Sequence, residues 1–136
     1  MQIHSTLTNR GGQVLPVVYQ DVDDEKVELA GKSVDAVHAY CFCGDKLVLV
    51  YADSKGYWTP PGGGVEAGEM VAEAVVREVQ EESNMKVLRQ RVIGCQEIAE
   101  PQGVVRQTHS VCLVEPYGEF VSDPDGDITK IALVSV

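Results

Sequence analysis

The sequence lacks any run of about eighteen apolar residues, and its amino-terminal segment does not place positive charge before an apolar stretch. A transmembrane helix needs the first feature and a secretory signal peptide needs the second. We therefore expect a cytoplasmic protein with no membrane partner. Its 136 residues are 44% hydrophobic and 24% charged, and they contain no internal repeat. This composition is typical of one globular domain spanning 1–136.

Positive charge is also scarce. Lys and Arg together number 11 against 21 Asp and Glu, which gives a formal net charge of −10. Such a balance argues against stable nucleic-acid binding, because non-specific binding of backbone phosphates relies on basic side chains. An acidic protein can still bind phosphates through metal ions.

The cysteines show no metal-binding arrangement. Four are present, and no two of them form a C-x-x-C unit. Cys41 and Cys43 share one strand-like run, whereas Cys95 and Cys112 lie in separate runs. We expect reduced thiols in or near the core rather than structural zinc or a disulfide framework.

Several stretches rich in Val, Ile, Tyr and Cys are bounded by turn residues, which is typical of strands. They are Gln13–Tyr19, Val34–Cys43, Lys46–Tyr51, Arg91–Ile98, Arg106–Glu115 and Ile131–Val136. Gly44-Asp45 predicts a hairpin between the second and third of these. The acidic stretch from Asp21 to Ser33 reads as a connection, with a brief strand around Val27 to Leu29.

One segment breaks the strand pattern and predicts a long helix. Met70 to Met85 contains neither Gly nor Pro and is rich in Ala, Glu, Gln, Met and Arg. The preceding residues, Trp58 to Gly64, include two prolines and three glycines and so cannot form a helix or a central strand. We expect a shaped loop that leads into the helix.

The helix places acids where core residues belong. At 100° per residue, one side collects Val71, Ala74, Val75 and Val79. Glu78 and Glu82 fall inside this stripe and Glu81 lies at its edge. Glu73, Arg77, Gln80 and Asn84 occupy the opposite side.

Three carboxylates in this position repel one another. Glu78 forms an i,i+3 pair with Glu81 and an i,i+4 pair with Glu82, and each pair costs roughly 0.2–0.5 kcal/mol when ionised. The negative end of the helix dipole adds about 0.3–1 kcal/mol per anion. A divalent cation such as Mg²⁺ or Mn²⁺ would offset this, since carboxylate oxygens are its preferred ligands. The alternative is that glutamate serves only as a good helix former, balanced by Arg77 and surface lysines.

Loop and helix together resemble the Nudix box of the Nudix (MutT-like) hydrolase family, whose pattern is G-x5-E-x7-R-E-U-x-E-E-x-G-U with U aliphatic. Gly63 and Glu69 match its first two positions, and the run Arg77-Glu78-Val79-Gln80-Glu81-Glu82 matches the next. Eight of the nine specified positions agree across residues 63–85, and Asn84 replaces the final glycine. This departure is mild, because Asn is the next best tolerated residue in the left-handed conformation wanted past a helix end.

The resemblance implies an α/β/α sandwich with a mixed sheet and a loop–helix–loop box. It also implies a pyrophosphohydrolase that uses Mg²⁺, or Mn²⁺, to cleave the diphosphate linkage of a small nucleoside diphosphate derivative. An NTP, ADP-ribose, a nucleotide sugar and a dinucleoside polyphosphate all remain open. Glu78, Glu81, Glu82 and the Gly63 carbonyl would bind the metal, and Glu69 with Arg77 would orient the loop and Glu78.

The general base would come either from the box or from a loop outside it. Glu81 or Glu82 would serve, and Glu115 and Glu119 are the candidates from outside the box. Tyr57 and Trp58 would either stack on a base or simply pack beside the loop.

Other features have plainer interpretations. His109 lies mid-strand and reads as a core or sheet-surface histidine. Residues 123–127 resemble a calcium loop, but the glycine is misplaced and Val134 stands where Glu is required, so a turn is expected.

The family usually ends with a helix, whereas this sequence ends in a strand-like run. Either that helix is absent or another element covers the sheet face, and a partner subunit in a homodimer would do so. The rival functions are a Nudix-like module that binds nucleotides without cleaving them and an acidic interaction domain without metal.

Overall fold

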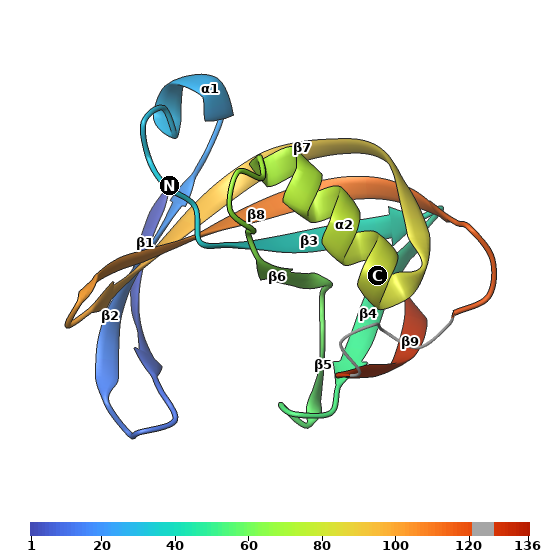
Figure 1. The fold of residues 1–136 in the computed structure, drawn as a ribbon, viewed down its shortest axis with the longest axis horizontal. Coiled ribbons are helices and arrows are strands. Elements are labelled where there is room, and N and C mark those ends of the chain that lie inside the picture. Colours follow the sequence, from blue (N-terminus) through green and yellow to red (C-terminus); the bar gives the residue numbers. More distant parts are fainter. Residues whose placement is uncertain (121–126) are drawn as a thin grey trace.

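The computed structural model describes residues 1–120 and 127–136. Its elements, labelled in Figure 1, are β1 (Gln2–Thr8), β2 (Val14–Asp21), α1 (Glu25–Glu28), β3 (Ala36–Cys43), β4 (Lys46–Ala52), β5 (Tyr57–Thr59), β6 (Gly62–Gly64), α2 (Val71–Ser83), β7 (Met85–Glu100), β8 (Gly103–Pro116) and β9 (Ile128–Ser135). No helix among the described residues has the length and apolar character needed to cross a membrane.

The strands form one mixed sheet. Its order is β1-β2-β7-β8-β3-β4-β5, with β6 paired to β3 and β9 paired to β4. The β3 and β8 strands run parallel, whereas every other pair is antiparallel. The Gly44-Asp45 hairpin is confirmed, because Cys43 pairs with Lys46 and Gly44 adopts a φ of 60° that suits glycine.

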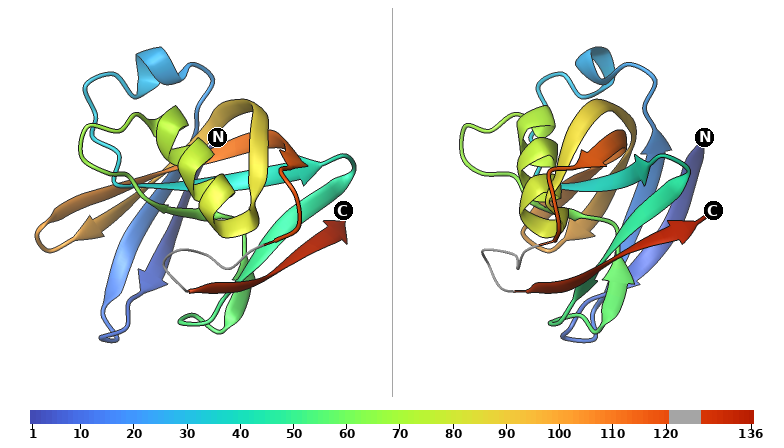
Figure 2. Two further views of the ribbon diagram at one scale, coloured as in Figure 1. Left: turned by 45° about the vertical axis from the view of Figure 1, so that its right-hand side comes forward. Right: turned by 90° about the vertical axis from the view of Figure 1, so that its right-hand side faces the viewer.

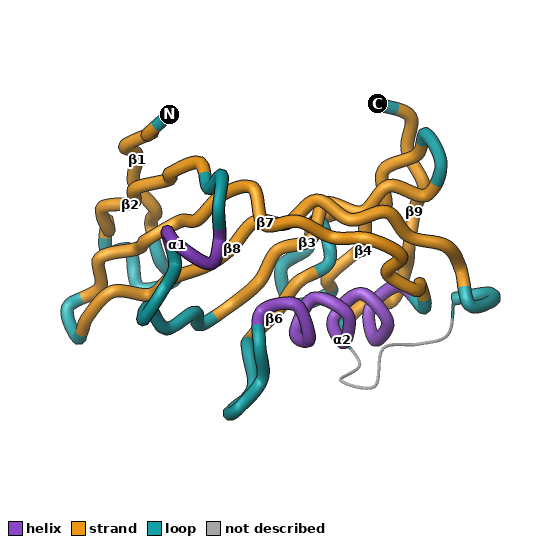
Figure 3. Tube along the Cα trace, turned by 90° about the horizontal axis from the view of Figure 1, so that it is seen from above, coloured by secondary structure: helices purple, strands orange, loops and turns teal. Residues whose placement is uncertain are grey.

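Helix α2 packs on one face of the central strands, as the views in Figures 2 and 3 agree. The strand β3 alternates buried and half-buried residues, so Val37, Ala39 and Cys41 all face the helix. Ala74, Val75 and Val79 of α2 pack against them and are fully buried. The mixed sheet and its packed helix confirm the expected α/β fold class, and they fix the inward side of α2.

The opposite face of the sheet carries no helix among the residues that the structure describes. A group of rings lies there instead, in which His109 is within 6 Å of the rings of Tyr19, His38 and Tyr40, at 5.4, 5.4 and 5.7 Å. The expectation of a covering partner subunit remains a prediction.

In the first third of the chain one expectation is wrong, and one strand was not predicted. The brief strand around Val27 to Leu29 is instead the single helical turn α1, which begins because Asp24 accepts a hydrogen bond from the Lys26 N–H. The strand β1 was not expected. All seven of its residues are exposed, so it lacks the alternation of buried and polar residues that marks a half-buried strand.

The expected strands elsewhere are confirmed, although their ends differ: β7 and β8 extend further at both ends, whereas β3 begins at Ala36 rather than Val34. The loop before α2 is more ordered than the sequence suggests, because β5 and β6 lie on either side of Pro60 and Pro61. Both remain peripheral strands, consistent with the exclusion of a central one. The cysteines are free thiols, as expected. Residues 123–126 of the calcium-like stretch lie outside the described residues.

Candidate active site

The glycine loop approaches the sheet and α2 so closely that side chains are excluded. A Cβ on Gly62 would collide with the Val37 carbonyl oxygen of β3. A Cβ on Gly63 would stand 2.5–2.8 Å from the carboxylate atoms of Glu78. Glycine at these two positions therefore lets β6 pair with β3 while touching the glutamate of α2.

Arg77 is the centre of the ionic network. Its Nε and Nη2 donate to both oxygens of Glu69, at 2.8 and 2.9 Å. Its Nη1 donates to Glu78 at 2.8 Å and to Glu81 at 3.3 Å, and Nη2 also reaches the Gly64 carbonyl at 2.9 Å. One guanidinium thus joins the loop, the acid before the helix and two acids on it.

This network also explains why Arg77 is covered. The helical wheel placed it on the side opposite the core, yet its side chain is only 21% exposed because the loop folds over it. Its contacts with Glu78 and Glu81 also mean that part of the repulsion between the helix acids is offset within the chain. The alternative to a metal ion, in which Arg77 balances the helix glutamates, therefore accounts for part of the charge compensation.

The pKa values follow from the same contacts. Hydrogen bonds from Arg77, and then from the Glu66 N–H, lower the pKa of Glu69 to about 2. Hydrogen bonds to Glu69 and Glu78 raise the pKa of Arg77 above its ordinary value. Both partners are charged at neutral pH.

The end of α2 has the backbone conformation that the box pattern requires. Asn84 adopts φ 53° and ψ 40°, the left-handed conformation in which the family pattern places glycine. Its side-chain amide donates to the Glu119 carbonyl at 2.8 Å, which ties the helix end to the chain after β8. Glu78 is buried in α2, and Glu81 and Glu82 are half-buried.

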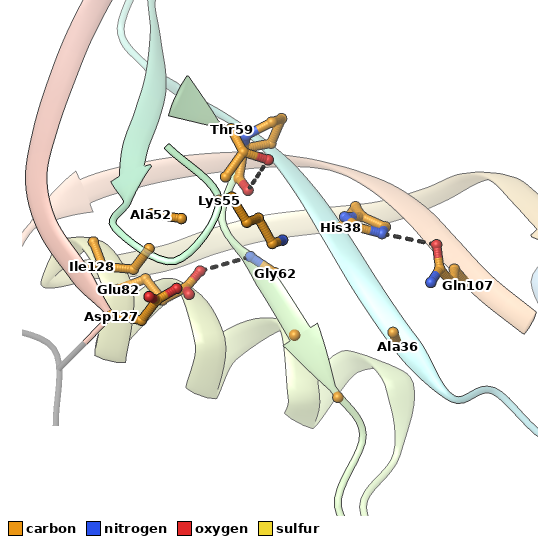
Figure 4. Close-up of a pocket in the computed structure, with 13 residues that line it drawn as sticks. Ala36, His38, Ala52, Lys55, Thr59, Gly62, Glu82, Gln107, Asp127 and Ile128 are labelled. Carbon is orange, nitrogen blue, oxygen red and sulfur yellow. Dashed lines mark hydrogen bonds between the residues drawn. The ribbon is translucent and has the colours of Figure 1, made fainter. Parts of the chain in front are cut away.

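Glu82 borders a cavity of about 210 Å³ beside the glycine loop. The Gly62 N–H donates to Glu82 Oε1 at 2.8 Å, and β6 forms one wall (Figure 4). Besides Thr59, the remaining polar lining comes from His38, Lys55, Gln107 and Asp127. His38 and Gln107 are joined by a hydrogen bond of 3.1 Å, and burial lowers the pKa of His38.

These four lining residues were not identified from the sequence. His38, Gln107 and Lys55 carry no spacing signal, because strands or turns far apart in the chain bring them to one cavity. Asp127 ends the acidic stretch that was read only as a turn.

Other residues expected at the site lie away from the cavity. Tyr57 and Trp58 are exposed, and the Trp58 ring packs edge-on against Tyr51 at 5.4 Å. Glu115 is exposed opposite Lys86 in the β7–β8 pair. Glu119 is exposed and uses its carbonyl to bind Asn84. His109 is half-buried in the ring group, as expected, and burial lowers its pKa to about 4.

The donor set is chemically suited to a hard divalent cation. Glu78, Glu81 and Glu82 supply carboxylate oxygens, and Gly63 lies against the Glu78 carboxylate. In the arrangement described, Glu78 and Glu81 face Arg77 and Glu82 faces the Gly62 N–H. Across residues 1–120 and 127–136, no three His, Cys, Asp or Glu side chains are grouped so that they could hold a metal ion.

Comparisons with known proteins agree on one family. The model of the NUDIX domain matches residues 32–136. The uncharacterized Nudix hydrolase YvcI of Bacillus subtilis (strain 168) is 36% identical over 50 residues, which span 37% of this chain and 32% of that protein. The match thus spans about a third of the relative's length.

Solved structures show the same fold. A mutant of the Bacillus subtilis pyrophosphohydrolase BsRppH superposes with a TM-score of 0.74 at 20% identity, covering 96% of this chain and 77% of that one. An ADP-ribose pyrophosphatase from Streptococcus suis gives a TM-score of 0.57 at 27% identity, covering 74% and 72%. Because the NUDIX domain model matches residues 32–136, which are most of this chain, the chain belongs to the Nudix family.

Proposed function

We propose that this protein is a Mg²⁺-dependent hydrolase that cleaves the diphosphate linkage of a nucleoside diphosphate derivative. The proposal rests on one observation: the glycine loop lies between the Arg77 hydrogen-bond network and the cavity. Gly62 to Gly64 contact Glu78 and Arg77 on one side and line the cavity with Glu82 on the other. A reacting phosphate in the cavity would therefore lie next to the box acids.

The named activities of similar structures support the reaction class. One is a pyrophosphohydrolase and another an ADP-ribose pyrophosphatase. Both names describe cleavage of a diphosphate bond, whereas the nucleotide part is open here. We infer a small-molecule nucleotide substrate and a cytoplasmic location, in keeping with the free thiols.

Glu78, Glu81, Glu82 and the Gly63 carbonyl would hold Mg²⁺ or Mn²⁺. When bound, the ion would neutralise charge on phosphate oxygens and make water more acidic. The Arg77–Glu69 pair positions the loop and Glu78. These roles depend on rotation of the glutamates away from their contacts with Arg77 and Gly62.

Glu82 is the general base that the geometry favours, because it is the box glutamate that lines the cavity. Its carboxylate would take a proton from water as the water oxygen attacks one phosphorus. The bond between that phosphorus and the bridging oxygen breaks, which releases a nucleoside monophosphate and a second phosphorylated product. Glu115 and Glu119 lie outside the cavity and are not favoured.

A substrate screen with a matched pair of variants tests the proposal. Wild-type protein, Glu82→Gln and Glu73→Gln would be incubated with Mg²⁺ or Mn²⁺ and an NTP, ADP-ribose, a nucleotide sugar and a dinucleoside polyphosphate. Glu73 lies on the exposed side of the same helix. We expect turnover by the wild type and by Glu73→Gln, and a loss of about 10²- to 10⁴-fold in kcat for Glu82→Gln. Binding of these compounds without turnover would instead indicate a non-catalytic module.

A further inference from the structure

We propose that Lys55 binds a phosphate of the substrate in the cavity that Glu82 lines. This inference rests on the proposed function, because it names a contact within the same site. Lys55 is contributed by the turn between β4 and β5, whereas the box lies on β6 and α2. Figure 4 shows its side chain pointing toward Gly62, with Glu82 on one side and His38 on the other.

The turn that carries Lys55 is fixed from both sides. Asp127 accepts hydrogen bonds from the Ser54 N–H at 2.9 Å and from the Ser54 hydroxyl at 3.0 Å. The Asp53 N–H donates to the Asp127 carbonyl at 3.0 Å, and the Lys55 N–H donates to the Ala52 carbonyl at 3.1 Å. Ala52 is buried in a small apolar cluster below the turn. The backbone of Lys55 is therefore held above the cavity before any ligand arrives.

The charge of Lys55 is not used elsewhere in the described part of the chain. It forms no ion pair there, whereas the acids that share its cavity have partners: Asp127 is bound by Ser54, and Glu82 accepts from the Gly62 N–H. Lys46, by contrast, donates from its Nζ to Ser135 Oγ at 2.7 Å. An exposed cation that lines a cavity without a carboxylate partner suits an anionic ligand.

Local positive charge matters more in this protein than in a neutral one. With a formal net charge of −10, the surface as a whole repels a nucleotide diphosphate. The cavity of about 210 Å³ exceeds by more than tenfold the roughly 10–15 Å³ that one water needs, which leaves room for a diphosphate group. With Glu82 on one wall and Lys55 on another, the phosphate nearer the box would react and its neighbour would contact the lysine.

The test compares Lys55→Met and Lys55→Arg with Lys130→Met. Lys130 is exposed on β9, with its Nζ 5.2 Å from the Tyr51 ring centroid, so its variant removes the same charge outside the cavity. KM and kcat would be measured on the compound turned over fastest in the substrate screen. Binding of Mg²⁺-imidodiphosphate, which is not hydrolysed, would be measured by calorimetry, and thermal unfolding would verify folding.

We expect Lys55→Met to raise KM and the imidodiphosphate Kd by about tenfold to a hundredfold with little change in kcat. Lys55→Arg should restore most of the affinity, and Lys130→Met should stay within about twofold of wild type. An unchanged KM in Lys55→Met, or an equal rise in Lys130→Met, overturns the inference while leaving the hydrolase function intact. If the wild type hydrolyses nothing, the proposed function fails. The imidodiphosphate titration then decides for Lys55: weaker binding to Lys55→Met supports the inference, and equal or absent wild-type binding overturns it.

Discussion

Replacing Arg77 by Met should destabilise the protein through Glu78. The methionine keeps the apolar length of the side chain but removes every hydrogen bond of the guanidinium. Glu78 is only 8% exposed, and its 2.8 Å contact with Arg77 Nη1 supplies an opposite charge. Without that partner, a buried carboxylate stays close to Glu81 and Glu82 at the negative end of the helix.

The size of the effect follows from burial. Removing one partner of a buried ion pair costs about 3–5 kcal/mol. The lower end applies here because the Arg77 side chain is 21% exposed, so we expect a loss of about 3 kcal/mol in the free energy of unfolding. The contacts with Glu69 are left out of this figure. For 136 residues the entropy of unfolding is about 0.3 kcal/mol/K, so Tm should fall by about 10 °C.

Thermal and denaturant unfolding in EDTA would measure this change. Arg91→Met is the matched control, because Arg91 is exposed on β7 and should tolerate the substitution within about 0.5 kcal/mol. Arg77→Lys should recover part of the stability, since it restores charge without the two-pronged contact. A loss below about 1 kcal/mol in Arg77→Met would refute the view that this arginine balances the inward acids.

Two further predictions concern the loop and the ring group. Gly63→Ala should destabilise the protein by about 1–3 kcal/mol and displace Glu78, because its Cβ would meet the carboxylate at 2.5–2.8 Å. Gly64→Ala is the control, since its Cβ would find its nearest neighbour at 3.9 Å; equal losses in the two variants would contradict the close packing at Gly63. His109 should make stability fall as the pH drops from 6.5 toward 4, because the unfolded imidazole gains its proton first, whereas burial holds the folded pKa at about 4. Comparing His109→Gln with wild type should show a difference of about 1–2 kcal/mol across this window, after allowance for solvent screening; parallel pH profiles would exclude it.

Local pattern was sufficient to predict the helix and its end. The absence of Gly and Pro from 70–85 gave α2 within two residues at each terminus. The conformation expected for position 84 is confirmed by the φ of Asn84. Both properties depend on residues close in sequence, so a linear pattern contains them.

Tertiary contacts account for what the sequence did not predict. A helical wheel treats Arg77 as an isolated position, so it could not show that the loop would fold over the guanidinium. Lys55 and Gln107 reach one cavity because β3 pairs with β8 on one side and with β4 on the other. The strand β1 lacks a buried face and therefore gives no periodic signal. The extent of the domain over 1–136 and the roles of the individual glutamates remain predictions.

The central claim is that the inward acids of α2 serve to bind a divalent cation. Isothermal titration of Mg²⁺ and Mn²⁺ into the wild type at neutral pH tests it directly, with a variant carrying Gln in place of Glu78, Glu81 and Glu82 as the comparison. We predict saturable uptake by the wild type that the variant loses. No uptake by the wild type, together with turnover that the substitutions leave unchanged, would contradict the account.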